Sequence, residues 1–122
     1  MDVSIVIPAK NEAANLINFL PRLKQAMPSA EIIVVNDGST DETQSICEEH
    51  GVKVVRHPYS KGNGAAIKSG AKAAQGDVIV FLDGDGQHKP EDIPRLLAEL
   101  ETGYDMVIGA RDNNARGGRE LV

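Results

Sequence analysis

Two aspartates separated by one glycine, Asp83 and Asp85, follow the most hydrophobic stretch of the chain, residues 77–82. Because they stand two residues apart at the end of a predicted strand, their carboxylates can point the same way. Together with the amide oxygen of Gln87 they form a set of hard oxygen ligands that suits Mg²⁺ or Mn²⁺ and leaves coordination positions for phosphate oxygens. Asp-Gly pairs also make simple turns. Taken alone, the motif leaves both interpretations open.

Further charged residues follow other predicted strands. Asp37 comes at the end of an apolar stretch, where a carboxylate can accept hydrogen bonds from a ribose hydroxyl or a base N–H. Glu12 could accept in the same way, although an acid in a first helical turn has an equally good structural role. Three basic residues could neutralise a diphosphate at the same edge, and each of them alone is better explained as a solvated surface charge: Lys10, Lys61 and Arg111.

Some loop residues have structural explanations that compete with function. Asn11 is a candidate N-cap of the helix that follows it. Ser39 and Glu42 form a capping box that predicts the start of another helix, with Asp41 as an acid of its first turn. The glycines at positions 62 and 64 precede a predicted helix, so backbone N–H groups there could face an anion. The remaining candidates are interpreted as structural or surface residues: Cys47, His50 and His57.

The elements that must position these groups alternate along the chain. Five short stretches rich in Val and Ile are predicted as buried strands, at residues 3–7, 31–35, 52–56, 77–82 and 106–109. Four segments with helical spacing lie between them, at residues 11–26, 39–50, 65–76 and 90–103. This order predicts an α/β fold, with a mostly parallel sheet and helices on both faces. Because the carboxyl ends of parallel strands open on one edge, the residues that follow the strands should meet there.

Composition narrows the class of protein. The 122 residues are expected to form one domain, and the formal charge of −5 argues against nucleic acid as the main partner. The single cysteine, the short apolar runs and an N-terminus without basic residues are typical of a cytoplasmic protein. A dinucleotide fingerprint and a P-loop motif are absent, and so are a G-x-S-x-G elbow and a Ser-His-Asp order that would indicate a hydrolase.

Four motifs in order and spacing carry a family resemblance over essentially the whole chain: residues 5–12, 35–41, 61–66 and 81–88. With these motifs the sequence resembles the family-two glycosyltransferases of the GT-A fold, which have a Rossmann-like nucleotide-binding part. Within that family it is similar to the dolichyl-phosphate mannose synthase and polyprenyl-phosphate sugar transferase group.

The resemblance implies a role for particular residues. The family's metal site falls on Asp83 and Asp85, with Gln87 as an additional ligand of Mg²⁺ or Mn²⁺, and Asp83 also belongs to the donor site. Basic residues that contact the diphosphate fall on Lys61 and Arg111. Asp85 and Arg111 are the residues with implied catalytic roles. The implied nucleoside contacts are Pro8, Ala9, Glu12 and Asp37.

The resemblance also implies a reaction, the inverting and metal-dependent transfer of a sugar from a GDP- or UDP-sugar. The implied acceptor is a polyprenyl or dolichyl phosphate, which would place the protein at a membrane surface. Family members continue well beyond residue 122, so we expect residues 1–122 to be a single nucleotide-sugar-binding domain without the acceptor half.

Two alternatives to this interpretation stay open. The chain could be a non-catalytic module that binds a nucleotide-sugar and works through a partner or by self-association, for which an exposed sheet edge could pair it with another copy. A signalling receiver domain has a similar length and sheet. That fold needs an aspartate after its third strand, where this chain has His57 and Pro58.

Overall fold

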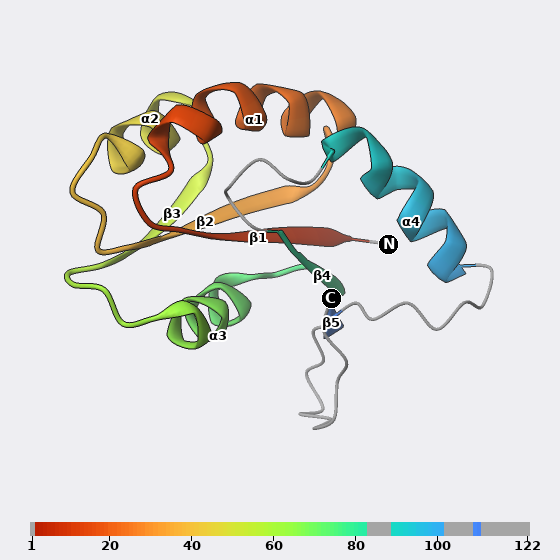
Figure 1. The fold of residues 1–122 in the computed structure, drawn as a ribbon. Coiled ribbons are helices and arrows are strands. Elements are labelled where there is room, and N and C mark those ends of the chain that lie inside the picture. The colour runs from red at the N-terminus through yellow and green to blue at the C-terminus, as the bar shows by residue number, and fades with distance from the viewer. Residues whose placement is uncertain (1, 83–88, 102–108, 111–122) are drawn as a thin grey trace.

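The computed structural model describes residues 2–82, 89–101 and 109–110 of the chain (Figure 1). Along the chain the elements are β1 Val3–Ala9, α1 Ala13–Ala26, β2 Glu31–Asp37, α2 Thr43–Glu49, β3 Lys53–His57, α3 Asn63–Ala73, β4 Val78–Phe81, the 3₁₀ helix η1 Pro90–Asp92, α4 Ile93–Glu101 and β5 Gly109–Ala110. The predicted alternation of strands and helices is confirmed, with element ends shifted by a few residues. Of the predicted fifth strand, residues 106–108 lie outside the described residues.

The sheet has the strand order β3-β2-β1-β4-β5, and its first four strands are parallel. β1 is central, with Ile5 opposite Ile32 in β2 and opposite Val80 in β4. This arrangement confirms the predicted α/β fold and brings the carboxyl ends of β1 to β4 to one edge.

The last strand departs from the prediction, because β5 pairs with β4 in the antiparallel direction. Arg111 is expected at the common edge only if the strand before it is parallel to the others. This expectation is wrong for β5, since the end of an antiparallel strand lies at the opposite edge. Arg111 itself lies outside the described residues, so its proposed role depends on the family resemblance alone.

Helices cover the two faces of the sheet unequally, with α1, α2 and α4 on one face and α3 on the other (Figure 1). On the first face, α1 buries the fully enclosed side chains of Leu16, Leu20 and Leu23 against the sheet. On the second face, a Cβ atom at Gly70 of α3 would lie only 2.2 Å from Val6 Cγ1. The absence of a side chain at Gly70 therefore lets α3 lie close to β1, as its small residues predict.

Two proline and glycine signals for helix ends are confirmed. α4 begins at Ile93, so Pro94 lies in its first turn, where a missing N–H costs no internal hydrogen bond. Gly51 follows the C-cap of α2 with φ of 68°, a left-handed conformation that glycine adopts without strain.

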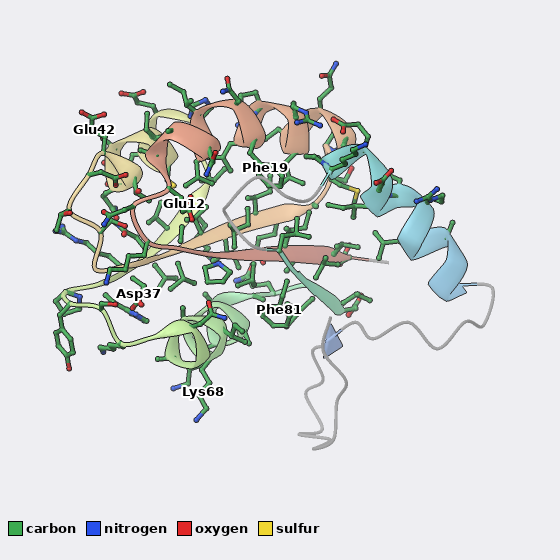
Figure 2. The ribbon with its side chains drawn as sticks, in the orientation of Figure 1. Glu12, Phe19, Asp37, Glu42, Lys68 and Phe81 are labelled. Carbon is green, nitrogen blue, oxygen red and sulfur yellow. The ribbon has the colours of Figure 1, made fainter. Side chains whose placement is uncertain are left out.

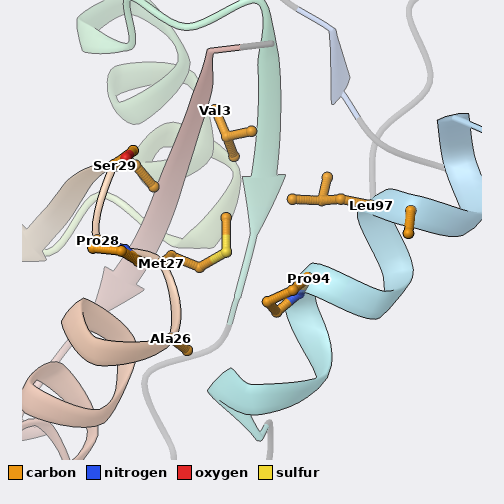
Figure 3. Close-up of a pocket in the computed structure, with 9 residues that line it drawn as sticks. Val3, Ala26, Met27, Pro28, Ser29, Pro94 and Leu97 are labelled. Carbon is orange, nitrogen blue, oxygen red and sulfur yellow. The ribbon is translucent and has the colours of Figure 1, made fainter.

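The amino-end edge of the sheet holds an apolar cavity of about 340 Å³ (Figure 3). Val3, Met27, Pro94 and Leu97 line it between the end of α1 and the face of α4. This cavity therefore lies at the edge opposite the one where the predicted site residues gather. No helix within the described ranges is long and apolar enough to cross a membrane.

Candidate functional site

Asp37 is the best-connected acid of the carboxyl-end edge, where it ends β2 (Figure 2). Its Oδ1 atom accepts hydrogen bonds from His57 Nδ1 at 2.7 Å and from the Lys61 backbone N–H at 2.8 Å. Its Oδ2 atom accepts from the Gly62 backbone N–H at 3.0 Å and from the Ser60 hydroxyl at 3.2 Å. The carboxylate therefore holds the whole loop between β3 and α3 against the end of β2.

These donors determine the charge of Asp37. Burial by itself would raise the pKa of the carboxyl, but the four hydrogen bonds favour the ionised form and lower the pKa to about 2. The side chain is therefore an anion at neutral pH. Backbone N–H groups near Gly62 are expected from the sequence to face an anion. In the structure the Gly62 N–H donates to the Asp37 carboxylate, which is that anion.

His57, the last residue of β3, connects this network to α3. Its Nε2 atom lies 2.8 Å from the Ser69 hydroxyl, and its ring is only 5% exposed. Because a carboxylate only accepts, His57 donates from Nδ1 to Asp37, and its Nε2 atom forms the hydrogen bond with the Ser69 hydroxyl. Of the two interpretations of His57, as a structural or a surface residue, its burial excludes the second.

An Asp-His-Ser chain of this kind resembles the hydrogen-bonding order of a hydrolase, which the sequence order did not reveal. Ser69 lies inside α3, and a helix uses the backbone N–H groups of its interior itself. Ser69 therefore lacks the adjacent pair of free N–H donors that stabilises an oxyanion. The chain from Asp37 through His57 to Ser69 ties α3 to the end of β2.

Gly38 allows the loops after β2 and β3 to touch. Its φ is 71°, and a Cβ atom there would lie 2.4 Å from the Ser60 backbone nitrogen. Any larger residue would therefore push the β3–α3 loop away from Asp37. The glycine of this motif is required by the close approach of two loops and by its left-handed backbone.

Asn11 connects the loops after β1 and β2. Its backbone N–H donates to the Ser39 hydroxyl at 2.9 Å. Its side-chain Oδ1 accepts from the backbone N–H groups of Thr40 at 2.8 Å and of Asp41 at 3.2 Å. The predictions of an Asn11 N-cap and of a capping box at Ser39 are wrong, because both polar groups bond to the neighbouring loop instead. Neither α1 nor α2 has a side-chain hydrogen bond from its own N-cap residue.

Asp41 caps both helices of this face from one position. Its carboxylate accepts the Ala13 backbone N–H at the start of α1, at 3.2 Å, and the Thr43 backbone N–H at the start of α2, at 2.9 Å. Burial raises the pKa of Asp41, but the stronger combined effect of its Thr43 and Ala13 hydrogen bonds lowers that pKa. The Glu12 N–H donates to the Thr43 hydroxyl at 3.1 Å and completes the connection.

Several other predicted site residues lie at the same edge. Pro8 and Ala9 end β1, opposite Val35 and Asn36 of β2. Glu12 is half-buried, and its Oε1 atom accepts from the Asn15 side chain at 2.8 Å.

Two predicted basic residues of this edge are exposed. Lys10 follows the end of β1, and Lys61 lies in the loop that Asp37 holds. The Lys61 Nζ atom lies 5.4 Å from the centre of the Tyr59 ring. The structure thus brings the described candidates of the first three loops to one edge.

The predicted metal ligands lie outside the described residues: Asp83, Asp85 and Gln87. The residue before them is fixed, because the Leu82 backbone N–H donates to the Val6 carbonyl oxygen at 3.0 Å. Within the described ranges, no group of three or more His, Cys, Asp or Glu side chains could hold a metal ion. The metal site therefore stays a prediction.

A comparison with protein family models decides which family the chain belongs to. The family model described as "Glycosyl transferase family 2" matches residues 4–121. The chain belongs to glycosyl transferase family 2. The resemblance carried by the four sequence motifs is thereby confirmed.

Two curated relatives illustrate the group within the family. The chain is 41% identical over 117 residues to a dolichol-phosphate mannosyltransferase of Pyrococcus furiosus, with 91% of this chain and 33% of that protein covered. It is 42% identical over 122 residues to an undecaprenyl-phosphate 4-deoxy-4-formamido-L-arabinose transferase of Pseudomonas fluorescens, with 91% and 36% covered. The chain thus spans about a third of the length of these relatives.

A solved structure confirms the GT-A fold class. Glucosyl-3-phosphoglycerate synthase of Mycobacterium tuberculosis, in complex with Mn²⁺, UDP and glucosyl-3-phosphoglycerate, has a TM-score of 0.72 and 32% sequence identity. The match covers 84% of this chain and 40% of that chain.

Proposed function

We propose that this chain is the donor-binding part of an enzyme that transfers a sugar from a GDP- or UDP-sugar to a polyprenyl or dolichyl phosphate. The observation that carries the proposal is that the three family motifs within the described residues, 5–12, 35–41 and 61–66, meet at the carboxyl-end edge of a family-two sheet. The named relatives transfer sugars to dolichol phosphate and undecaprenyl phosphate. A structural neighbour holds UDP and Mn²⁺. Basic side chains can bind the phosphates of a nucleotide, and acidic side chains can bind Mn²⁺. Both kinds of side chain occur among the candidate site residues.

The nucleoside is proposed to lie across the ends of β1 and β2, against Pro8, Ala9, Glu12 and Asp37. The described hydrogen bonds already use both oxygens of Asp37. The Ser60 hydroxyl makes the longest of these bonds, at 3.2 Å. A ribose hydroxyl or a base N–H would therefore replace or share the Ser60 contact, while the two backbone donors continue to hold the loop.

The diphosphate is proposed to contact Lys61 and Arg111. Asp83, Asp85 and Gln87 supply carboxylate and amide oxygens, which is the donor set that Mg²⁺ and Mn²⁺ prefer. Such an ion, when bound, would neutralise charge on the departing nucleoside diphosphate. With Asp85 and Arg111 on the leaving-group side, the acceptor would attack the anomeric carbon from the opposite face and invert it. A lipid phosphate is already an anion and needs no general base.

Titration calorimetry with GDP and UDP, in the presence and absence of Mn²⁺, tests donor binding by the full chain. Lys61→Gln should weaken binding of the favoured nucleotide several-fold, because a cation near a phosphate contributes about 1 kcal/mol or more. Lys89→Gln, an exposed lysine on the α4 side, is the matched control. Absence of binding to either nucleotide would refute the proposal.

A transfer assay with polyprenyl phosphate then separates two activities. Turnover supports the transferase. Nucleotide binding without turnover identifies the chain as a nucleotide-sugar-binding module instead. Association of two copies through the exposed sheet edge stays a prediction, and the exposed Lys53 and Arg56 of edge strand β3 are charges that oppose such pairing.

A further inference from the structure

The charges of this chain are strongly segregated along the sequence. Residues 50–76 contain five of the 13 Lys and Arg residues and none of the 18 Asp and Glu residues. This segment therefore carries a formal charge of +5, and the rest of the chain, with eight basic and 18 acidic residues, carries −10. An asymmetry of this size indicates a surface that recognises an anionic partner.

The structure places three of these five basic residues on α3 or in the loop before it. Lys68 and Lys72 are four residues apart on one helix face, and both side chains are exposed. Figure 2 shows Lys68 pointing away from the sheet. Lys61, Lys68 and Lys72 line one open groove of about 410 Å³ together with Ala65 and Ser69. Residues 58–73, which form α3 and the loop before it, contain no Asp or Glu.

Tyr59 adds an exposed ring beside the groove. It is 65% exposed and is one of two large exposed hydrophobic side chains among the described residues. Its ring lies 5.4 Å from the Lys61 ammonium group. Exposed tyrosines and lysines together are typical of protein surfaces that lie at the level of lipid headgroups. We call Tyr59, Lys61, Lys68 and Lys72 the α3 face.

We propose that the α3 face docks on an anionic lipid surface. The inference depends on the proposed function, because a lipid-phosphate acceptor is available only at a membrane. Charge complementarity supports it, since the rest of the chain is acidic and would be repelled by the same surface.

The position of the α3 face supports the same partner. Lys61 belongs both to the α3 face and to the loop that Asp37 holds at the carboxyl-end edge. A membrane in contact with this face would therefore lie beside the donor site. Because Asp37 holds the loop that contains Lys61, Lys61 and the carboxyl-end edge would approach the membrane together.

Vesicle co-sedimentation of the full chain tests the proposal. Phosphatidylcholine vesicles with about 30 mol% phosphatidylglycerol are compared with pure phosphatidylcholine vesicles at low salt. The chain should bind the anionic vesicles and should be released as NaCl rises from about 50 to about 500 mM. Failure to bind anionic vesicles would overturn the proposal.

A charge-matched pair of variants locates the surface. Lys68→Gln/Lys72→Gln removes two positive charges from the α3 face, and Lys89→Gln/Arg95→Gln removes two from the α4 side. Since each lysine near an anionic surface changes partitioning about fivefold, the first variant should lose roughly 25-fold and the second little. Equal losses in both variants would show an effect of net charge only and would overturn the proposal.

Additional measurements keep the result unambiguous. Lys68→Gln alone should weaken vesicle binding about fivefold. This single variant replaces the double variant if the double variant unfolds at a lower temperature than the wild type. Tyr59→Ala should also weaken vesicle binding, whereas Ile17→Ala, at the other exposed hydrophobic residue, should not.

Competing ligands decide between partners. Release from vesicles by millimolar inorganic phosphate would indicate a site for small anions instead of a lipid surface. Binding of single-stranded RNA without vesicle binding would indicate a nucleic-acid surface. Calorimetry with GDP and UDP on the same variants separates this proposal from the proposed function, because Lys68 and Lys72 should not alter nucleotide affinity.

Discussion

The two faces of the central sheet are packed by opposite means. Under α1, α2 and α4, long aliphatic side chains such as Leu16 and Leu20 fill the space between helix and sheet. Under α3, the small side chain of Ala66, the bare backbone at Gly70 and the C-cap residue Ala74 meet the sheet, and the polar side of the helix carries lysines. The first face should therefore be sensitive to loss of volume and the second to gain of volume. The α3 layer is also the one proposed to dock on a lipid surface.

Leu20→Ala should have the largest effect on stability. Leu20 is fully buried in the first core, and removal of a buried leucine leaves a cavity that costs about 2–5 kcal/mol. Urea unfolding of the variant and the wild type measures the difference. The control is Ile17→Ala in the same helix, where the side chain is 47% exposed and the loss should stay below about 1 kcal/mol. Similar losses in both variants would remove the distinction between core and surface on this face.

Gly70→Ala should lower the free energy of unfolding by about 1–3 kcal/mol, although alanine is the better helix former. The added Cβ would lie 2.2 Å from Val6 Cγ1 and 3.1 Å from Val35 Cγ2, both on stiff, buried side chains. At Gly64 of the same helix, a Cβ meets nothing within 4 Å. Gly64→Ala should therefore gain up to about 1 kcal/mol. A neutral Gly70→Ala variant would show that α3 packs less closely than described.

The Asp37 network predicts a pH dependence of stability. The folded-state pKa is depressed from 3.8 to about 2, so the stabilisation is complete above pH 4 and is lost as pH falls through about 2. A shift of this size corresponds to about 2 kcal/mol. Asp37→Asn should lower stability at pH 7 and flatten the pH dependence between about 4 and 2 in urea unfolding.

The control for the Asp37 effect is Asp41, an acid that belongs to a different set of hydrogen bonds. Asp41→Asn should leave the pH dependence that belongs to Asp37 in place, since Asp41 accepts its hydrogen bonds from Ala13 and Thr43. An unchanged pH profile in Asp37→Asn would contradict the assignment.

Patterns local in sequence predicted most of the fold. Continuous apolar runs identified the first four strands, and Pro94 and Gly51 identified helix ends, because such signals act on the residues beside them. The small residues of α3 predicted its close packing for the same reason. The direction of β5 could not be predicted in this way, since a short apolar run contains no signal that distinguishes a parallel from an antiparallel partner.

The site was predicted less completely than the fold. The position of Asp37 at the edge followed from strand order, but its bonds to His57 and Lys61 join residues 20 and 24 positions apart. The pairing of Asp37 with His57 in the parallel register of β2 and β3 could have suggested the first of these contacts. The helix caps failed because a polar side chain near a helix start is free to bond to another loop that tertiary structure brings closer.

The smallest predicted effect tests whether the polar side chains near the starts of α1 and α2 bond to a neighbouring loop instead of capping the helices. Ser39→Ala removes the acceptor of the exposed Asn11 N–H and should cost about 0.5–1.5 kcal/mol. Glu42→Ala should cost less than about 0.5 kcal/mol, because the Glu42 side chain makes no capping bond. A capping box requires both substitutions to be harmful, since each side chain would then bond to the other residue's backbone. Equal losses in urea unfolding would restore the capping box, and an effect of Ser39→Ala alone would support the connection between the two loops.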